Sequence, residues 1–172
     1  MEIGVPKEPA NESRVAIVPG SMKKLIKAGF EVLIEKGAGI NANYSDEQYE
    51  DLGAKVVSRK KALECENIIC INYPGLDGIS KDTNLICVSD PFRNPQSVKE
   101  CMDANVTLMS MDMIPRRLSR AQSMDVNSSQ DNLAGYKAVL LGAANVPRGI
   151  PMMTTSAGTV RPAKVVVMGS GV

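Results

Sequence analysis

Short apolar runs alternate with amphipathic stretches along residues 1–110, and this alternation limits the possible folds more than any other feature of the chain. The apolar runs predict strands at 1–5, 30–34, 55–57, 67–71, 84–88 and 106–110. Capping residues and proline predict helices that begin at Ser21, Ser45 and Asn94, with a short helix at 59–64. Strand-helix alternation with right-handed crossovers predicts an α/β domain, a doubly wound parallel sheet of Rossmann-like or flavodoxin-like type.

The remainder of the chain does not continue this alternation of strands and helices. Ser128 and Asp131 form a capping pattern ahead of a mostly apolar stretch, which predicts a long helix reaching about Val146. Residues 147–163 are rich in proline, glycine and threonine and are typical of a linker. The continuous apolar run Lys164–Met168 then predicts a strand. The predicted organisation is an N-terminal domain at 1–126, a connecting helix and linker at 127–163, and the beginning of a dinucleotide-binding domain at 164–172.

Composition excludes several classes of protein. The 172 residues are 44% hydrophobic and 23% charged, which suits one globular domain, or one domain and the start of another. The net charge of +1 argues against a nucleic-acid partner. No apolar run approaches the roughly 20 residues that span a bilayer. The chain has four cysteines without a CxxC pair and no histidine, so no metal site is predicted and a reducing, cytoplasm-like compartment is expected.

The missing histidine also limits the chemistry. Oxidation of an alcohol or an amine needs a base that titrates near neutral pH, and histidine is the usual one. This chain must use another base, run a reaction that needs none, or not be catalytic alone.

The end of the chain, VVVMGSGV, is typical of the strand and first turn of a dinucleotide-binding unit. In such a unit the first glycine, here Gly169, makes the tight turn, and the second, Gly171, lets the backbone approach a pyrophosphate. A third glycine and the following helix are not part of this sequence. A simple glycine turn after a strand is the alternative interpretation, and GxG alone favours that one.

Polar residues crowd the stretch PRRLSRAQSMD, at 115–125, between a predicted strand and the predicted long helix. Because ligands bind at the carboxyl edge of parallel sheets, its arginines, Gln122 and Asp125 can converge on a ligand amide. A solvated polar loop is the alternative, and the residues alone leave the two interpretations even.

Arg14 follows the first predicted strand, within the stretch ESRVAIVP, and therefore lies at the same carboxyl edge. Its guanidinium can bind a carboxylate or a carboxamide of a ligand. The alternative is a surface ion pair with Glu8 or Glu12.

Several of these stretches resemble one known family. The opening IGVPKE, ESRVAIVP and FEVLIEKGAGINANYSDEQYEDLGAKV are similar to the start of alanine dehydrogenase and of proton-translocating nicotinamide nucleotide transhydrogenase. PRRLSRAQSMDVNSSQDNLAGYKAV resembles the transhydrogenase branch, and TTSAGTVRPAKVVVMGSGV resembles that branch's entry into its NAD-binding domain. The resemblance covers nearly the whole chain, and its most specific portion is SRAQSMD with SSQxNxAGY.

The resemblance implies particular site residues. In transhydrogenase the matching loop holds the nicotinamide ring of NAD(H), which implies Arg117, Gln122, Asp125 and Ser128 as cofactor-binding residues. The family pattern has one arginine after the proline where this chain has Arg116 and Arg117. Counting back from Gln122 selects Arg117, and the extra residue leaves Arg116 as the alternative.

The alanine dehydrogenase branch carries a substrate-binding lysine and a catalytic histidine. Local matching places Ile71 and Val88 at those positions, so only Arg14 of a substrate-like pocket remains. An alanine dehydrogenase-like oxidoreductase is therefore the second interpretation. A truncated, non-catalytic interaction module is the third.

By this resemblance the chain is the N-terminal portion of the NAD(H)-binding alpha subunit of transhydrogenase, an enzyme that transfers hydride between NADH and NADP+ and couples the transfer to proton translocation. The implied partners are an NADP(H)-binding domain, a membrane domain and a second copy in a homodimer. The implied location is peripheral, on the cytoplasmic side of a membrane or the mitochondrial matrix equivalent. Alone, the chain is expected to be inactive and to bind no cofactor tightly.

Overall fold

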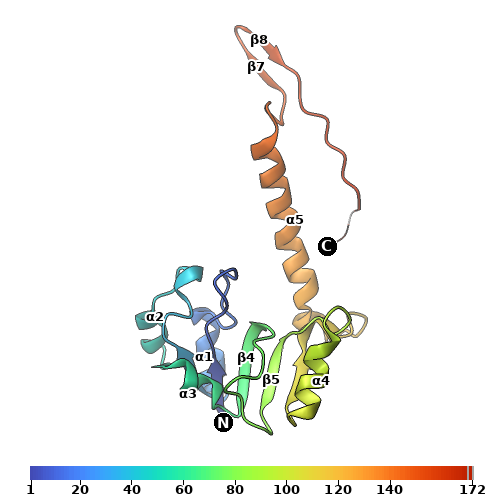
Figure 1. Cartoon of the computed structure of the whole chain (residues 1–172). Helices are drawn as coiled ribbons and strands as arrows, with labels where there is room; N and C mark the ends of the chain where they lie inside the picture. The colour runs from blue at the N-terminus through green and yellow to red at the C-terminus, as the bar shows by residue number, and fades with distance from the viewer. Residues whose placement is uncertain (170, 172) are drawn as a thin grey trace. The chain divides into compact units, whose positions relative to one another are not determined.

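The computed structural model describes residues 1–169 and 171 and divides the chain into two compact units (Figure 1). The first unit is Met1–Ile114 and the second is Pro115–Val172. The sequence placed a boundary at residue 126, whereas the structure groups the polar loop 115–125 with the helix that follows it.

The first unit is built on one parallel sheet of six strands. In chain order these are β1 (Glu2–Val5), β2 (Glu31–Glu35), β3 (Lys55–Val57), β4 (Asn67–Asn72), β5 (Asn84–Val88) and β6 (Thr107–Ser110). Their spatial order is β3-β2-β1-β4-β5-β6. The chain runs outward from β1 to β3, returns to the other side of β1 and runs outward again to β6. This order confirms the predicted doubly wound sheet and places its reversal point between β1 and β4.

Helices cover both faces of this sheet: α1 (Pro19–Lys27), α2 (Asp46–Glu50), α3 (Arg59–Leu63) and α4 (Pro95–Asp103), with short 3-10 turns η1 (Ile40–Ala42) and η2 (Met111–Met113). One buried cluster joins one face of β1 and β2 to α1 and α2 through Ile3, Val5, Val32, Ile34, Met22 and Tyr49. A second cluster joins β4 and β5 to α3 and α4 through Ile68, Cys70, Leu85, Cys87, Leu63 and Cys101. Because side chains alternate along a strand, the two clusters lie on opposite faces.

The first residues of α1, α2 and α4 show which sequence signals determine where a helix begins. Gln48 accepts a hydrogen bond from the Ser45 backbone N–H at 3.0 Å, which confirms the capping box of α2. Asn94 is the N-cap of α4, whose first helical residue is Pro95, in agreement with the helix start predicted at Asn94. The predicted start of α1 at Ser21 is wrong, because the helix begins at Pro19. Proline suits the first helical turn, since its fixed φ is helical and its missing N–H needs no partner there.

The second unit consists of η3 (Gln122–Met124), the helix α5 (Val126–Asn145) and a two-stranded antiparallel hairpin, β7 (Met153–Thr155) with β8 (Gly158–Val160). The long helix is confirmed, although it begins at Val126 rather than at Ser128. The linker prediction for 147–163 missed the hairpin, because threonine and glycine suit a short hairpin as well as a loop. Among the described residues, no helix is both long and apolar enough to cross a membrane.

The strand predicted at Lys164–Met168 is not formed: residues 161–169 have no regular secondary structure. A strand needs hydrogen-bonding neighbours, and within the described residues the hairpin strands pair only with each other. Gly169 adopts a φ of +96°, a conformation that favours glycine. Gly171 stands between Ser170 and Val172, which lie outside the described residues, so the predicted glycine turn is described only in part.

Gly4, in the central strand β1, allows the sheet to approach α3. A Cβ added at Gly4 would lie 1.8 Å from the Ala62 carbonyl oxygen, so the backbone would have to shift. We therefore expect Gly4→Ala to lower the free energy of unfolding by about 1–3 kcal/mol, which is the usual cost of adding atoms to a well-packed core. Urea denaturation followed by circular dichroism measures this change.

Gly20→Ala is the matched control, because nothing lies within 4 Å of a Cβ added at this position in α1. It should leave stability unchanged or raise it by less than about 1 kcal/mol, since alanine is the better helix former. Equal effects of the two substitutions would contradict the close contact at Gly4.

Candidate functional site

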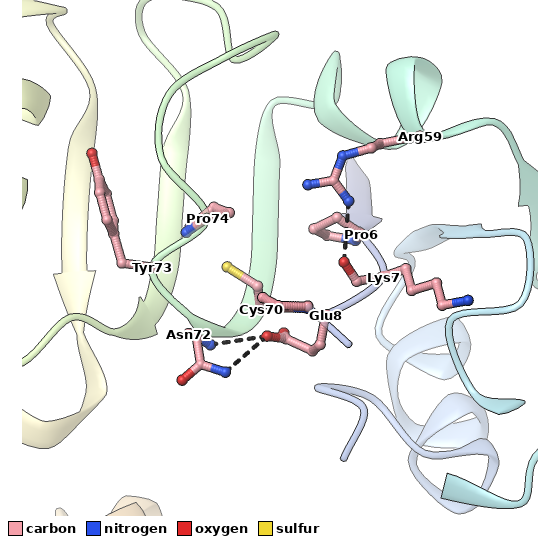
Figure 2. Close-up of a pocket in the computed structure, with 9 residues that line it drawn as sticks. Pro6, Lys7, Glu8, Arg59, Cys70, Asn72, Tyr73 and Pro74 are labelled. Carbon is pink, nitrogen blue, oxygen red and sulfur yellow. Dashed lines mark hydrogen bonds between the residues drawn. The ribbon is translucent and has the colours of Figure 1, made fainter. Parts of the chain in front are cut away.

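The reversal of strand order between β1 and β4 leaves a cavity of about 360 Å³ at the carboxyl edge of the sheet (Figure 2). Its lining comes from the segment after β1, from α3, from the end of β4 and from the segment after β4: Pro6, Lys7, Glu8, Pro9, Arg59, Cys70, Asn72, Tyr73 and Pro74. Doubly wound sheets bind ligands at this position, because the connections from the two strands diverge there. The cavity is therefore a candidate ligand site of the first unit.

Arg59 and Lys7 form the cationic wall of the cavity, and Glu35 holds both of them in place. Arg59 forms an ion pair with Glu35 at 3.0 Å and donates to the Lys7 carbonyl oxygen at 3.1 Å. The Lys7 backbone N–H donates to the same carboxylate at 2.7 Å. These contacts fix the start of the segment after β1 against α3.

Two other lining residues carry groups that can in principle lose a proton. A hydrogen bond with Cys87 and burial raise the pKa of the Cys70 thiol, so it stays protonated and inert as a nucleophile. Burial and a hydrogen bond to Glu100, 2.8 Å from the phenol oxygen, raise the pKa of Tyr73. Neither group supplies a base near neutral pH, and no cluster of the described residues is arranged to hold a metal ion.

The polar wall of the cavity is formed by a buried carboxylate. Glu8 is only 8% exposed and accepts hydrogen bonds from the Ile71 backbone N–H at 2.6 Å and from the Asn72 backbone N–H at 3.2 Å. The Asn72 side-chain amide donates to it as well, at 3.1 Å. Glu8 therefore joins the segment after β1 to the end of β4, across the reversal point of the sheet.

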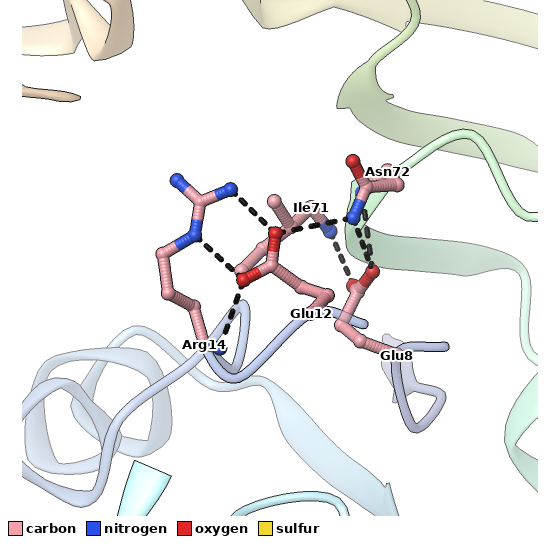
Figure 3. Close-up of polar contacts among 5 residues, drawn as sticks. All are labelled: Glu8, Glu12, Arg14, Ile71 and Asn72. Atoms are coloured by element: carbon pink, nitrogen blue, oxygen red, sulfur yellow. Dashed lines mark hydrogen bonds and ion pairs between the residues drawn. The ribbon is translucent and has the colours of Figure 1, made fainter. Parts of the chain in front are cut away.

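Arg14 lies beside this wall and is paired with Glu12 (Figure 3). Its Nε and Nη2 donate to the two Glu12 oxygens at 2.8 and 2.6 Å, and its backbone N–H donates at 2.9 Å. These hydrogen bonds lower the pKa of Glu12 to about 2. Of the two interpretations of Arg14, the structure shows the ion pair, and the partner is Glu12.

Sequence reasoning missed Glu8 and Asn72 as site residues. Both stand directly after a strand or at its end, at the carboxyl edge, and this position was the available signal. Ile71 and Val88, which lie at the ends of β4 and β5, are half-buried and apolar. They place no proton-transfer group at the positions where the alanine dehydrogenase resemblance expects a lysine and a histidine.

The two neighbouring arginines of the polar loop 115–125, Arg116 and Arg117, make different contacts. Arg116 pairs with Asp125 at 3.2 Å, donates to the Ser128 hydroxyl at 3.1 Å and lies 3.6 Å from Asp131. Arg117 is exposed and makes no hydrogen bond or ion pair with any described residue. The side chain of Arg116 is thus bound within the protein, whereas the side chain of Arg117 is open to a ligand.

Asp125 is the N-cap of α5. Its carboxylate accepts from the Ser128 backbone N–H at 2.9 Å and from the Ser128 hydroxyl at 2.5 Å. These hydrogen bonds, with a smaller effect of Arg116, lower the pKa of Asp125. Gln122, in η3, has an exposed side chain without a hydrogen bond to the described residues. The loop residue Asp125 is therefore bonded to Ser128 in the first turn of α5, whereas the loop side chains of Arg117 and Gln122 have no partner among the described residues.

Comparison with known proteins places the chain in a family. Residues 4–134 match the family model described as alanine dehydrogenase/PNT, N-terminal domain. The chain is 41% identical over 183 aligned residues to a Rhodospirillum rubrum protein named as the first of the parts of NAD(P) transhydrogenase subunit alpha. This match covers all of the chain and 47% of that protein.

Solved structures agree with this assignment. The transhydrogenase from Sinorhizobium meliloti superposes with a TM-score of 0.90 at 39% identity, covering 95% of the chain and 50% of that structure. An L-alanine dehydrogenase superposes with a TM-score of 0.81 at 30% identity, covering 94% and 46% respectively. The chain spans about half the length of each of these three relatives. It belongs to the alanine dehydrogenase/PNT family, whose N-terminal domain it contains.

Proposed function

We propose that the chain is the N-terminal portion of the NAD(H)-binding alpha subunit of an NAD(P) transhydrogenase. In the complete enzyme, hydride passes between NADH and NADP+, and this transfer is coupled to proton translocation. The observation that carries the proposal is the 41% identity, over the full length of the chain, to a protein named as belonging to that subunit.

The chemistry of the chain supports this reaction. A hydride that moves between two nicotinamide carbons requires no proton transfer to a heteroatom at that step, so the site needs no general base. The chain has no histidine, and the raised pKa values of Cys70 and Tyr73 keep both groups protonated. What the reaction demands is alignment of two rings at reacting distance and exclusion of water.

The loop 115–125 is the proposed nicotinamide site. The carboxamide of the ring both donates and accepts hydrogen bonds, and the exposed side chains of Arg117 and Gln122 offer both kinds of partner. Asp125 and Ser128 complete the proposed site by holding the start of α5, against which the loop closes. Gly169 and Gly171 are proposed to let the backbone approach the pyrophosphate.

The proposed partners follow from the reaction. NADP(H) is carried by a partner domain, and a membrane domain couples hydride transfer to proton movement. The chain would then be peripheral, on the cytoplasmic side of a membrane or the mitochondrial matrix equivalent. The residues at the expected substrate positions do not support an alanine dehydrogenase activity, because Ile71 and Val88 are apolar and Arg14 is already paired.

One prediction concerns the free side chains of the loop in the complete enzyme. Replacing Gln122 with Met, or Arg117 with Met, keeps side-chain length and removes the hydrogen-bonding groups. Single-turnover hydride transfer should slow on the order of a hundredfold, because a misplacement of about 1 Å of the reacting ring has that effect. Affinity for NADH should largely survive, since the adenosine and pyrophosphate contacts lie elsewhere.

Neighbouring arginines provide matched controls. Arg120→Met changes an exposed arginine of the same loop whose side chain has no partner among the described residues, and should leave the rate unchanged. Arg116→Met removes the contacts with Asp125 and Ser128, and should lower the melting temperature more than the Arg117 change does. A rate that is normal in both Arg117→Met and Gln122→Met would remove the loop from the nicotinamide site.

Another prediction concerns the 172-residue chain alone. We expect it to bind NADH weakly and without saturation, because one loop and a glycine turn provide too few contacts to hold the cofactor. Fluorescence titration with NADH, with the complete enzyme as the positive control, measures this. Tight binding by the chain alone would mean that the cofactor site lies in the doubly wound unit.

A further prediction concerns the proposed homodimer. Helix α5 has no buried residue, and Leu133, Tyr136 and Leu140 form an apolar stripe on it that is 47–67% exposed. If this stripe lies in the dimer contact, Leu140→Glu should shift the sedimentation coefficient toward that of a monomer. Glu50→Lys, an exposed charge change in α2, is the control. A dimer unaffected by Leu140→Glu would place the contact on another surface.

A further inference from the structure

The connection between β4 and β5 contains an exposed turn formed by an aspartate and a glycine. A hydrogen bond of 3.1 Å from the Ile79 backbone N–H to the Leu76 carbonyl oxygen closes this turn. Asp77 and Gly78 occupy its two central positions, and both are exposed. Asp77 is the only aspartate in the sequence that is followed by glycine, and no asparagine is followed by glycine. The turn therefore presents to solvent a carboxyl group next to a peptide nitrogen that no neighbouring side chain shields.

The groups of this pair are not engaged elsewhere. Within the described part of the chain, the Gly78 backbone N–H donates no hydrogen bond, and the Asp77 carboxylate accepts none and forms no ion pair. Gly78 has a φ of +81° and no Cβ that would obstruct an approach to its nitrogen. Because a single hydrogen bond closes the turn, the peptide group between the two residues can rotate at little cost.

An aspartate in these surroundings can transfer its backbone linkage to its side chain. The Gly78 nitrogen attacks Cγ of the protonated Asp77 carboxyl group, an N–Cγ bond forms, and the Cγ–OH group leaves with the amide proton as water. The product is a cyclic imide, which water reopens. Addition of water at Cγ restores aspartate, whereas addition at the backbone carbonyl carbon yields isoaspartate. The mass is unchanged, no oxidant or cofactor takes part, and the backbone becomes longer by one methylene.

We propose that Asp77 is a site of spontaneous isoaspartate formation in the folded protein, and that its product is a substrate for a methyltransferase that recognises isoaspartyl carboxylates. The change would lengthen the backbone between Leu76 and Ile79, which both pack against the second buried cluster. It would also alter the segment that begins with Tyr73 and Pro74, which line the cavity. This inference does not depend on the proposed transhydrogenase function.

Prolonged storage of the folded 172-residue chain at neutral pH and physiological temperature tests the proposal. Digestion releases the peptide 62–81, in which Asp77 is the only aspartate. Electron-transfer fragmentation and methyl transfer from labelled S-adenosylmethionine then measure isoaspartate in this peptide. Its rate of formation should be within about tenfold of the rate in a synthetic peptide of residues 73–83, which corresponds to an added barrier below about 1.4 kcal/mol. The melting temperature of the stored protein should fall as isoaspartate accumulates.

Two controls separate this reaction from general ageing. Asp77→Glu keeps the charge but lengthens the side chain, so it should abolish methyl transfer to this peptide. Asp103, which is exposed at the end of α4 and followed by alanine, should remain aspartate. Isomerisation of Asp77 more than about tenfold slower in the folded chain than in the synthetic peptide would overturn the proposal. Equal rates at Asp77 and Asp103 would also overturn it.

Discussion

The central strand β1 must be covered on both faces and paired on both edges, and the first unit depends on this constraint. Ile3 and Val5 fill one face, while Gly4 leaves the other face free for the backbone of α3. Parallel strands are stable only when buried in this way, which is why the flanking segments are helices. The same constraint separates the connections after β1 and β4, and the cavity lies where they diverge.

Much of this unit was predictable because its signals are local. Apolar runs such as 84–88 coincide with strands, and Pro95 and the Ser45 box mark helix starts that depend on a few neighbouring residues. The hairpin at β7 and β8 gave no such signal, because its strands are three residues each and fully exposed. The strand at Lys164–Met168 failed for the opposite reason: its sequence is suitable, but the described residues provide no strand to pair with it.

The site was predictable only in outline. Strand order placed Arg14 at the carboxyl edge, but its partner depends on side-chain geometry, and spacing alone did not choose between Glu8 and Glu12. The contacts of Glu8 with Ile71 and Asn72 join residues more than 60 positions apart and follow from the neighbouring positions of β1 and β4. Similarly, the sequence did not separate Arg116 from Arg117, whereas their side chains have entirely different surroundings.

The cluster around Arg116 also has a consequence for the entropy of the loop. Because Arg116 contacts Asp125 and Ser128, residues 117–124 form a closed ring whose two ends are tied together at the first turn of α5. Closing a flexible segment costs chain entropy, and here the folded protein has met that cost before any ligand arrives. Arg117 and Gln122 are therefore displayed on a segment whose two ends are both held at the first turn of α5.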